Sequence, residues 1–397
     1  MNLIGLQFDV QREFGQNIFL IKKVEYLDAD DVALYFENPE SDLAFSKKFP
    51  RKFGGAAFSL RGSPTFMTNS GDWIQSANGE LVVFPPSGSS DLGMSLIVPK
   101  LTTLLKIKGS SQKKIKNLIF SNLHFVETTW VKPLQGFVPS QASVVYFTEN
   151  GTVAIPGAIE IEYAENLKID QCFFENIGSS AVVAKEGVYN AEITRNIFSK
   201  ISASAIVMGA DLKKKPEPEG VSANGKILGN FITDVGTNYY GSVGIFLGYL
   251  SGSEIAFNTL KNMPYTAISV GWGWTKELTS LHSNSIHNNY ISGAMKLLSD
   301  GGGIYLVSYQ PETMIYNNYI SDMRLSEWAT FKFFSVIYLD NGVGGVNVFD
   351  NFYNNIYSSD GERGKFFFDQ KGNLGNFYSS GRNLKINSIV FGVSGIY

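Results

Sequence analysis

The sequence is poor in the residues that build disulfides and most metal centres. Its 397 residues include one cysteine, Cys172, and three histidines, His124, His282 and His287. A single cysteine excludes an internal disulfide and a thiolate metal cage, and the histidines do not fall at a His-x-x-x-His spacing. The sequence therefore indicates no metal site and no cofactor.

Charge and long apolar runs are also scarce. Charged residues make up 17% of the chain, and the formal net charge is −3 with no basic stripe. Binding to nucleic-acid phosphates needs clustered lysine and arginine, so we expect no nucleic-acid partner. No run of about 18 apolar residues occurs, so we expect no membrane span. The oligomeric state is left open.

The N-terminus does not have the basic and then apolar stretch of a leader peptide. It opens on MNLIGLQFDV, which is strand-like. This leaves open an intracellular protein, a mature form or an incomplete chain, and the sequence is compatible with a full-length form that is secreted or periplasmic.

Apolar residues, glycine and turn formers are plentiful. The chain is 44% hydrophobic and has 40 glycines, which fits a turn-rich β protein, and it shows no long linker. Residues 1–100 follow no clear period. There, VALYF (32–36) and LVVFPP (81–86) predict short strands, and Asn78-Gly79 predicts a hairpin turn between WIQSA and ELVVF.

Beyond residue 100 the chain contains an internal repeat. Its core is an apolar residue, two variable residues, asparagine and then aliphatic or aromatic positions, as in ITRNIFSKI and IYNNYISDM. Cys172 occupies the same slot in IDQCFFENI, and the spacing between successive slots runs from 24 to 34 residues. The asparagines of the slot are Asn196, Asn230, Asn258, Asn289, Asn318, Asn351 and Asn376.

This period predicts the coils of a parallel β-solenoid. Two or three strands of about five residues with their turns fill one coil, and successive coils stack about 4.8 Å apart. The repeated asparagines would then form a ladder, each side-chain amide bonding the next. We expect an irregular β-rich segment over 1–100 and the solenoid over 101–397.

Several stretches resemble a known family. They are FSNLHFVETTW (120–130), FFENIGSSAVV (173–183), MPYTAISVGWGW (263–274), LLSDGGGIYLVSYQPET (297–313) and VIYLDNGVGG (336–345), with GDWIQSANGELVVFPP (71–86) before them. The chain resembles the right-handed parallel β-helix glycoside hydrolases, most closely family 141, which contains α-L-fucosidases and xylanases. The resemblance implies an all-β, right-handed parallel β-helix that acts on a carbohydrate, with Asp300 and Asp340 as the catalytic pair. Asn341 stands where such enzymes often carry an acidic residue.

The chemistry of glycoside cleavage also favours this pair, because it needs one carboxyl group as acid and another as nucleophile or base. Aligning GIYL with VIYL places Asp340 opposite Val307, at the end of a strand. Asp300 lies seven positions before Val307, so the pair can meet only if the chain bends, and we expect positive φ at Gly301–Gly303. Each aspartate alone also fits a structural turn residue.

Aromatic residues beside the pair are candidates for sugar binding. If GWGW is extended, Trp272 and Trp274 point to one face and can stack on sugar rings, with Tyr265 as a third wall. Plugging the end of a coil is the alternative. We expect His282 and His287 in surface loops. Other acids can complete or replace the pair, namely Glu254, Glu277, Glu312, Asp322 and Glu327.

The sequence thus predicts a glycoside hydrolase acting on a plant or microbial polysaccharide or oligosaccharide. Two alternatives on the same fold stay open. One is a polysaccharide lyase, although neither a calcium-type carboxylate cluster nor a lysine or arginine lies next to the two aspartates in sequence. The other is a non-catalytic carbohydrate-binding β-helix, which would keep the aromatic residues without needing both acids.

Overall fold

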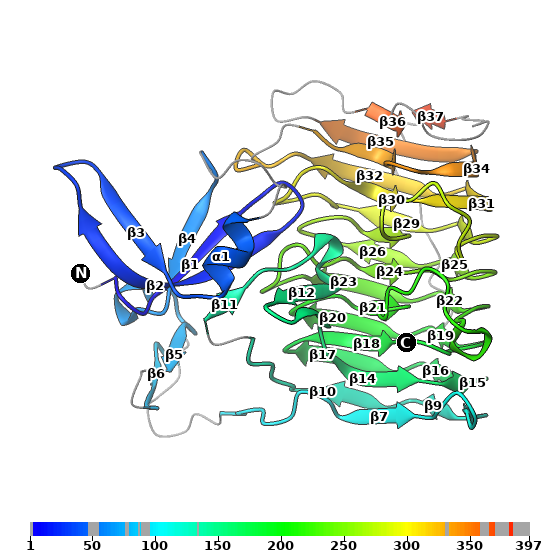
Figure 1. The fold of residues 1–397 in the computed structure, drawn as a ribbon, viewed down its shortest axis with the longest axis horizontal. Coiled ribbons are helices and arrows are strands. Elements are labelled where there is room, and N and C mark those ends of the chain that lie inside the picture. The colour runs from blue at the N-terminus through cyan, green and yellow to red at the C-terminus, as the bar shows by residue number, and fades with distance from the viewer. Residues whose placement is uncertain are drawn as a thin grey trace.

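The computed structural model describes residues 3–46, 55–75, 79–85, 88, 96–132, 135–329 and 333–357, together with the backbone of two short strands beyond them. Three parallel sheets stack coil upon coil to form a β-helix, and a smaller antiparallel sheet lies beside it (Figure 1). The expected parallel β-helix is confirmed. Asn78 and Asn376 lie outside the described residues.

Successive coils contribute strands in turn to three sheets. The first sheet consists of β7 (Leu105–Lys108), β14 (Gly157–Glu162), β18 (Ser180–Ala184), β21 (Ile206–Met208), β24 (Ile245–Leu247), β27 (Ile268–Val270), β30 (Gly302–Leu306), β33 (Ser335–Leu339) and β36 (Lys365–Asp369). The second consists of β9 (Ile119–Ser121), β16 (Lys168–Asp170), β19 (Glu192–Thr194), β22 (Lys226–Leu228), β25 (Glu254–Ala256), β28 (Ser285–His287), β31 (Tyr309–Tyr316) and β34 (Gly344–Phe349). The third consists of β10 (His124–Val126), β17 (Phe173–Ile177), β20 (Ile197–Ile201), β23 (Phe231–Val235), β26 (Thr259–Lys261), β29 (Tyr290–Ser292), β32 (Tyr319–Arg324), β35 (Asn351–Tyr357) and β37 (Gly381–Asn383).

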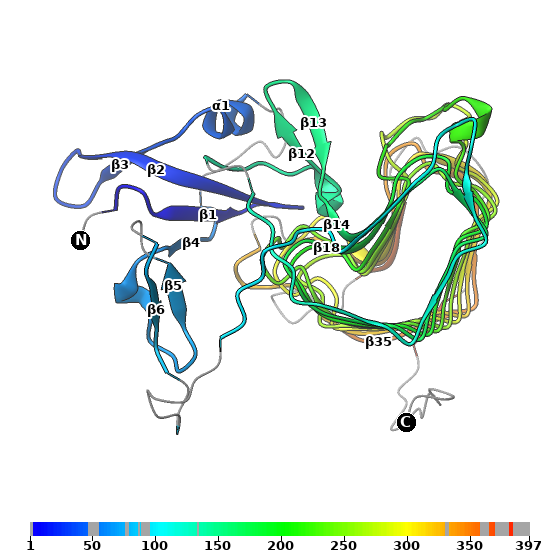
Figure 2. The same cartoon turned by 90° about the horizontal axis from the view of Figure 1, so that it is seen from below.

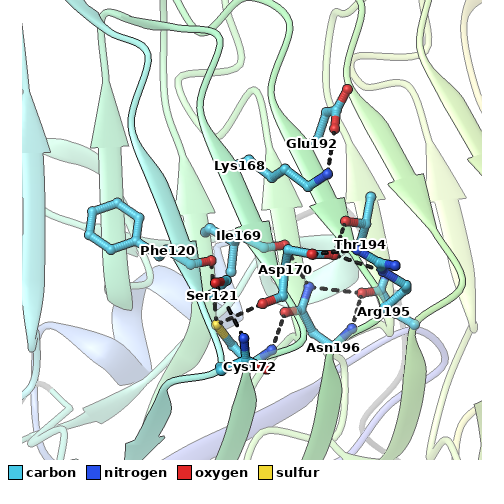
Figure 3. A network of polar contacts seen from close by, with 12 residues as sticks. Phe120, Ser121, Lys168, Ile169, Asp170, Cys172, Glu192, Thr194, Arg195 and Asn196 are labelled. Atoms are coloured by element: carbon cyan, nitrogen blue, oxygen red, sulfur yellow. Dashed lines mark hydrogen bonds and ion pairs between the residues drawn. The ribbon is translucent and has the colours of Figure 1, made fainter. Parts of the chain in front are cut away.

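The predicted asparagine ladder fills the turn between the second and third sheets. Asn230 is representative: its Nδ2 donates to Asn258 Oδ1 at 2.9 Å and to the carbonyl of Ile193 at 2.8 Å. At the start of the row, the backbone N–H of Cys172 donates to Asn196 Oδ1 at 2.8 Å (Figure 3). The bonds continue to Asn351, and the six described asparagines are all buried. The ladder therefore satisfies backbone groups that the tight turns leave unpaired.

The core of the β-helix follows from the alternation of side chains along these strands. In β30, Ile304 and Leu306 point into one continuous apolar core, whereas Tyr305 lies on the other face of the sheet. The same alternation in β33 places Ile337 and Leu339 inside and Tyr338 outside. Residues two apart share a face, so Asp340 follows Tyr338 onto the outer face of the first sheet.

The antiparallel sheet is built by the N-terminal segment with one later strand. Its order is β11-β2-β1-β4, with β3 also paired to β2. The strands are β1 (Gln7–Gln11), β2 (Gln16–Tyr26), β3 (Val32–Phe36), β4 (Phe58–Arg61) and β11 (Gly136–Phe137). Because β11 comes from an insertion in the first coil, the N-terminal sheet contains a strand that is covalently continuous with the β-helix.

Shorter elements complete the chain. They are α1 (Glu40–Phe45), η1 (Pro64–Phe66), η2 (Gln141–Ser143), η3 (Pro218–Gly220), the antiparallel pairs β5 (Trp73–Gln75) with β6 (Leu81–Val83) and β12 (Val145–Thr148) with β13 (Gly151–Ala154), and the parallel pair β8 (Ile115–Lys116) with β15 (Ala164–Glu165). The predicted strands at 32–36 and 81–83 and the pairing across residues 76–80 are confirmed. Of the helices in the described part of the chain, none has both the length and the apolar character to cross a membrane.

Seen along the axis of the β-helix, the N-terminal sheet lies on the side of the first sheet, near β14 and β18 (Figure 2). Ile18 and Phe137 of the N-terminal sheet share an apolar cluster with Ala203 and Tyr239, which belong to turns of the coils. Burial of these aromatic and aliphatic side chains joins the two parts, since each such side chain contributes about 1.5–3 kcal/mol when fully buried.

Candidate active site

A cavity of about 480 Å³ lies between the N-terminal sheet and the outer face of the first sheet. One wall comes from the β-helix: Trp272, Trp274, Asp300, Tyr338, Asp340 and Asn341. The other comes from the N-terminal sheet and the insertion: Arg12, Phe14, Gly15, Asn17, Val138, Pro139, Ser140, Gln141 and Phe147. The volume is within the range that holds a small-molecule ligand.

Asp300 is placed by the turn that leads into β30. Its own backbone has φ 53°, and its N–H donates to the carbonyl of Phe333 in the next coil at 2.8 Å. The bend that brings it to the cavity is therefore at Asp300. Aspartate tolerates this left-handed conformation better than most residues.

The expectation of positive φ at Gly301–Gly303 is wrong, since none of these glycines has it. They are required for packing. A Cβ at Gly301 would lie 2.8 Å from Tyr265 Cε2, and one at Gly302 would lie 2.7 Å from the carbonyl of Ser335. The three glycines therefore let the neighbouring coils and Tyr265 approach the backbone closely.

Asp340 directly follows β33 and is 8% exposed. Its N–H donates to the carbonyl of Leu306 at 2.8 Å, and pairing of Leu306 with Leu339 confirms the predicted position opposite Val307. One carboxylate oxygen, Oδ2, accepts from the indole N–H of Trp274 at 3.1 Å and from the hydroxyl of Tyr305. Two donors from different elements therefore fix this carboxylate at the cavity wall.

Two tyrosines link the aspartates across adjacent coils. Tyr305 and Tyr338 are direct partners in β30 and β33, with ring centroids 5.3 Å apart. Tyr338 donates to Asp300 Oδ1 at 3.0 Å, and Tyr305 donates to Asp340. Each tyrosine thus bonds the aspartate of the other coil. The repeated aromatic position in GIYL and VIYL is the sequence signal that identifies these two residues.

The surroundings of Asp300 change its acidity. Burial and then the negative charge of Asp340 raise the pKa of Asp300, the hydrogen bond from Tyr338 lowers it, and the net pKa is about 7. Burial beside the aspartates also raises the pKa of Tyr305 and Tyr338. A carboxyl group with a pKa near neutrality has the acidity that general acid catalysis favours.

The two tryptophans line the cavity, although not through an extended strand. Gly271, Gly273 and Trp274 all have positive φ, so the GWGW segment is a turn, and the condition that it is extended is not met. The rings nevertheless lie together, with centroids 5.4 Å apart, and Trp274 is 41% exposed. An exposed indole next to a carboxylate suits stacking on a sugar ring.

Tyr265 does not form a third wall, and that expectation is also wrong. Its side chain is 1% exposed and does not line the cavity. Its hydroxyl donates to the backbone carbonyl of Asp300 at 2.9 Å. Tyr265 therefore supports the turn that carries Asp300.

Arg12, Phe14 and Gln141 are cavity residues that sequence reasoning missed. Arg12 is 3% exposed, and burial lowers the pKa of its guanidinium to about 10 against the opposing effect of Glu13. The backbone carbonyl of Glu13 accepts from the N–H of Ser299, next to Asp300, at 2.7 Å. No periodic pattern marks these positions, because they belong to the N-terminal loop and the insertion.

The other candidates lie elsewhere. Asp300 and Asp340 are the acidic residues among those lining the cavity, and none of the five alternative acids lines it. His282 is exposed as expected. His287 is not in a surface loop: it lies in β28, is 8% exposed and contacts Glu254 at 3.1 Å. Within the described ranges, no three His, Cys, Asp or Glu side chains group closely enough to hold a metal ion.

Comparison with known proteins gives one extensive structural likeness. A solved structure described as a glycoside hydrolase superposes with a TM-score of 0.83 at 25% sequence identity, covering 95% of this chain and 68% of that chain. No family model matches the sequence, and neither does any curated protein.

Two further solved structures are much less similar. One is the GH136 lacto-N-biosidase from Eubacterium ramulus, with a TM-score of 0.36, 10% identity and coverage of 70% of this chain and 59% of that chain. The other is the Streptococcus pneumoniae surface protein and adhesin PfbA, with a TM-score of 0.28, 12% identity and coverage of 62% and 72%. TM-scores this low give no ground for an inference about this chain.

Proposed function

We propose that this protein is a glycoside hydrolase that cleaves a plant or microbial polysaccharide or oligosaccharide, in the manner of the fucosidases and xylanases of family 141. The observation that carries the proposal is the pair of aspartates from adjacent coils at one tryptophan-lined cavity. The likeness to a solved glycoside hydrolase over 95% of this chain supports it.

The two aspartates take different roles in the proposed reaction. Asp300, whose pKa burial and Asp340 raise to about 7, gives its proton to the glycosidic oxygen as the bond breaks. Asp340 accepts from Trp274 and Tyr305 and has no donor role in these contacts, as expected of an ionised carboxylate. It acts on the anomeric carbon, either directly as nucleophile or by taking a proton from water. Trp272 and Trp274 hold the sugar.

The test is a screen for reducing-sugar release from fucosylated pectin fragments and xylans. Asp300→Asn and Asp340→Asn each remove one carboxyl group and nearly preserve its shape, so kcat is expected to fall at least about 100-fold. Asp322→Asn is the matched control, because Asp322 is an exposed residue of β32 outside the cavity. Sugar binding that persists with no release from any substrate would instead point to a carbohydrate-binding protein.

A polysaccharide lyase is the second candidate, and Arg12 is the observation that favours it. A lyase removes a proton beside a uronate carboxylate, and Arg12 brings a cation with a lowered pKa into the cavity. The products differ, because a lyase leaves a carbon–carbon double bond that absorbs ultraviolet light. A lyase is expected to produce this absorption, to lose it in Arg12→Gln, and to lose it on chelation and regain it when Ca²⁺ is added. These results together would support the lyase and contradict the hydrolase.

A further inference from the structure

Gln141 lies in a position that connects the two aspartates through their supporting tyrosines. It begins η2, in the insertion between β11 and β12, and is 7% exposed. Its Nε2 donates to the hydroxyl of Tyr265 at 3.1 Å, and its Oε1 accepts from the hydroxyl of Tyr305 at 3.4 Å. Tyr265 in turn holds the backbone of Asp300, and Tyr305 holds the carboxylate of Asp340.

The hydrogen-bond inventory fixes the orientation of this amide. A carbonyl can only accept, so the single proton of the Tyr265 hydroxyl goes to the carbonyl of Asp300. Its contact with Gln141 must therefore come from a donor, which is the N–H side of the Gln141 amide. The oxygen of the amide consequently faces Tyr305. A side chain that replaces glutamine must therefore donate on one side and accept on the other.

Tyr305 has one proton and two acceptors. While Asp340 is ionised, the charged carboxylate is the stronger acceptor, and the closer contact is indeed with Asp340. When Asp340 gains a proton or bonds to the sugar, it becomes a weaker acceptor. The Tyr305 hydroxyl can then turn to Gln141 Oε1, so that it keeps a partner throughout the reaction.

The segment around Gln141 is held firmly enough to act as a support. Ala142 and Ser143 have positive φ, and the N–H of Ser140 donates to the carbonyl of Val145 at 2.8 Å. On the other side, a Cβ at Gly241 would lie 2.6 Å from Ser143 Oγ, so the coil packs directly against this turn.

We propose that Gln141 is a positioning residue of the active site, which sets the orientation of Asp300 through Tyr265 and serves as the alternative acceptor for Tyr305 when Asp340 loses its charge. The proposal rests on the proposed function for its kinetic part. Its structural part, the linkage of Gln141 to both aspartates, can be measured without any substrate.

The kinetic test compares Gln141→Met with Gln141→Glu. Methionine has a similar shape and makes neither hydrogen bond, so kcat is expected to fall about 10- to 100-fold with KM little changed. The carboxyl introduced by Gln141→Glu can donate to Tyr265 and accept from Tyr305 only while protonated. Its activity is therefore expected to recover as the pH falls, which moves the pH optimum to the acid side of wild type.

A buried glutamine elsewhere provides the matched control. Gln310 is 0% exposed, and its Nε2 donates to the carbonyls of Val270 and Val307. Gln310→Met is expected to lower the thermal midpoint and keep the wild-type pH profile. A Gln141→Met enzyme with wild-type kcat, or a Gln141→Glu enzyme with the wild-type pH profile, would overturn the proposal.

The substrate-free test uses NMR of protein labelled with carbon-13 at the aspartate carboxyl groups, with Asp300→Asn and Asp340→Asn to assign the signals. Both signals are expected to shift in Gln141→Met and to stay in place in Gln310→Met. If Gln141→Met does not fold, Tyr265→Phe removes only a hydroxyl and must shift the Asp300 signal. Unshifted signals overturn the proposal, whereas a wild-type protein inactive on every glycan overturns only the proposed function.

Discussion

At the scale of single residues, the proposed hydrolysis depends on how burial and hydrogen bonds set the protonation of Asp300. Burial raises the pKa of Asp300, and the hydrogen bond that Tyr338 donates to Asp300 lowers it, so that the net pKa is about 7. In the proposed reaction Asp300 must be protonated to act as an acid, so activity is expected to fall as the pH rises through about 7. The carboxyl group of Asp300 has a raised pKa, and its protonated form, which the proposed reaction needs, is the form present below that pKa.

Tyr338→Phe tests this dependence. Removing the hydroxyl removes an interaction that favours the ionised form of Asp300, so its pKa rises and the alkaline limb of kcat/KM moves to higher pH, by up to about one unit. The measurement is the pH profile of kcat/KM, with Tyr316→Phe on β31 as control. An alkaline limb that stays in place or moves to lower pH contradicts the assignment of Asp300 as the acid.

Residue by residue, sequence reasoning identified part of this site. The spacing of the coils placed Asp340 opposite Val307, and the two tryptophans do line the cavity. The expectation for Tyr265 was wrong because the sequence does not indicate which of the neighbouring aromatic rings, Tyr265, Trp272 or Trp274, faces solvent. Its ring packs in the core of the β-helix, and its hydroxyl accepts from Gln141, which is 124 positions away in the chain.

At the scale of the elements, the asparagine ladder determines how the turns between the second and third sheets are satisfied. Asn258 accepts from the N–H of Asn230 at 2.9 Å and donates to the carbonyl of Ile227 at 2.8 Å. Both backbone groups are buried in the tight turn and can find no water. The regular spacing of asparagine in the sequence was enough to predict this ladder.

Asn258→Ala is expected to lower the free energy of unfolding by roughly 2–6 kcal/mol, because it leaves two backbone groups buried without partners at about 1–3 kcal/mol each. Urea unfolding followed by circular dichroism measures the change. Asn238→Ala is the control, since Asn238 is exposed and its side chain donates to Ser202 Oγ at 3.2 Å. A ladder variant as stable as this control would show that the asparagines are ordinary turn residues.

At the scale of the whole molecule, the cavity exists because the N-terminal sheet is packed on the coils. The loop between β1 and β2 and the turn η2 both approach Gly241, where a Cβ would lie 3.2 Å from Gly15 Cα and 2.6 Å from Ser143 Oγ. This close approach brings Arg12 and Gln141 to the face that carries the aspartates. The division into segments 1–100 and 101–397 stays a prediction.

Gly241→Val inserts a branched side chain at this contact and is expected to push the N-terminal sheet away from the coils. The rate of hydrolysis is expected to fall by at least about 10-fold, because small displacements of positioning groups lower the rate strongly. The circular dichroism of the β-helix is expected to stay unchanged. Gly220→Ala is the control, because a Cβ there meets nothing nearer than 3.3 Å. Wild-type activity in Gly241→Val would mean that the N-terminal wall of the cavity is dispensable.

The sequence by itself determined the stacked coils, the asparagine ladder and the register that places Asp340 after its strand. These features repeat, and each depends only on residues within one coil and its neighbours. The tertiary structure alone decided which side chains face Asp300 and Asp340 across the cavity. Arg12 and Asp300 are 288 positions apart (300 − 12), and both line the cavity because the N-terminal sheet packs on the coils, which no local pattern encodes.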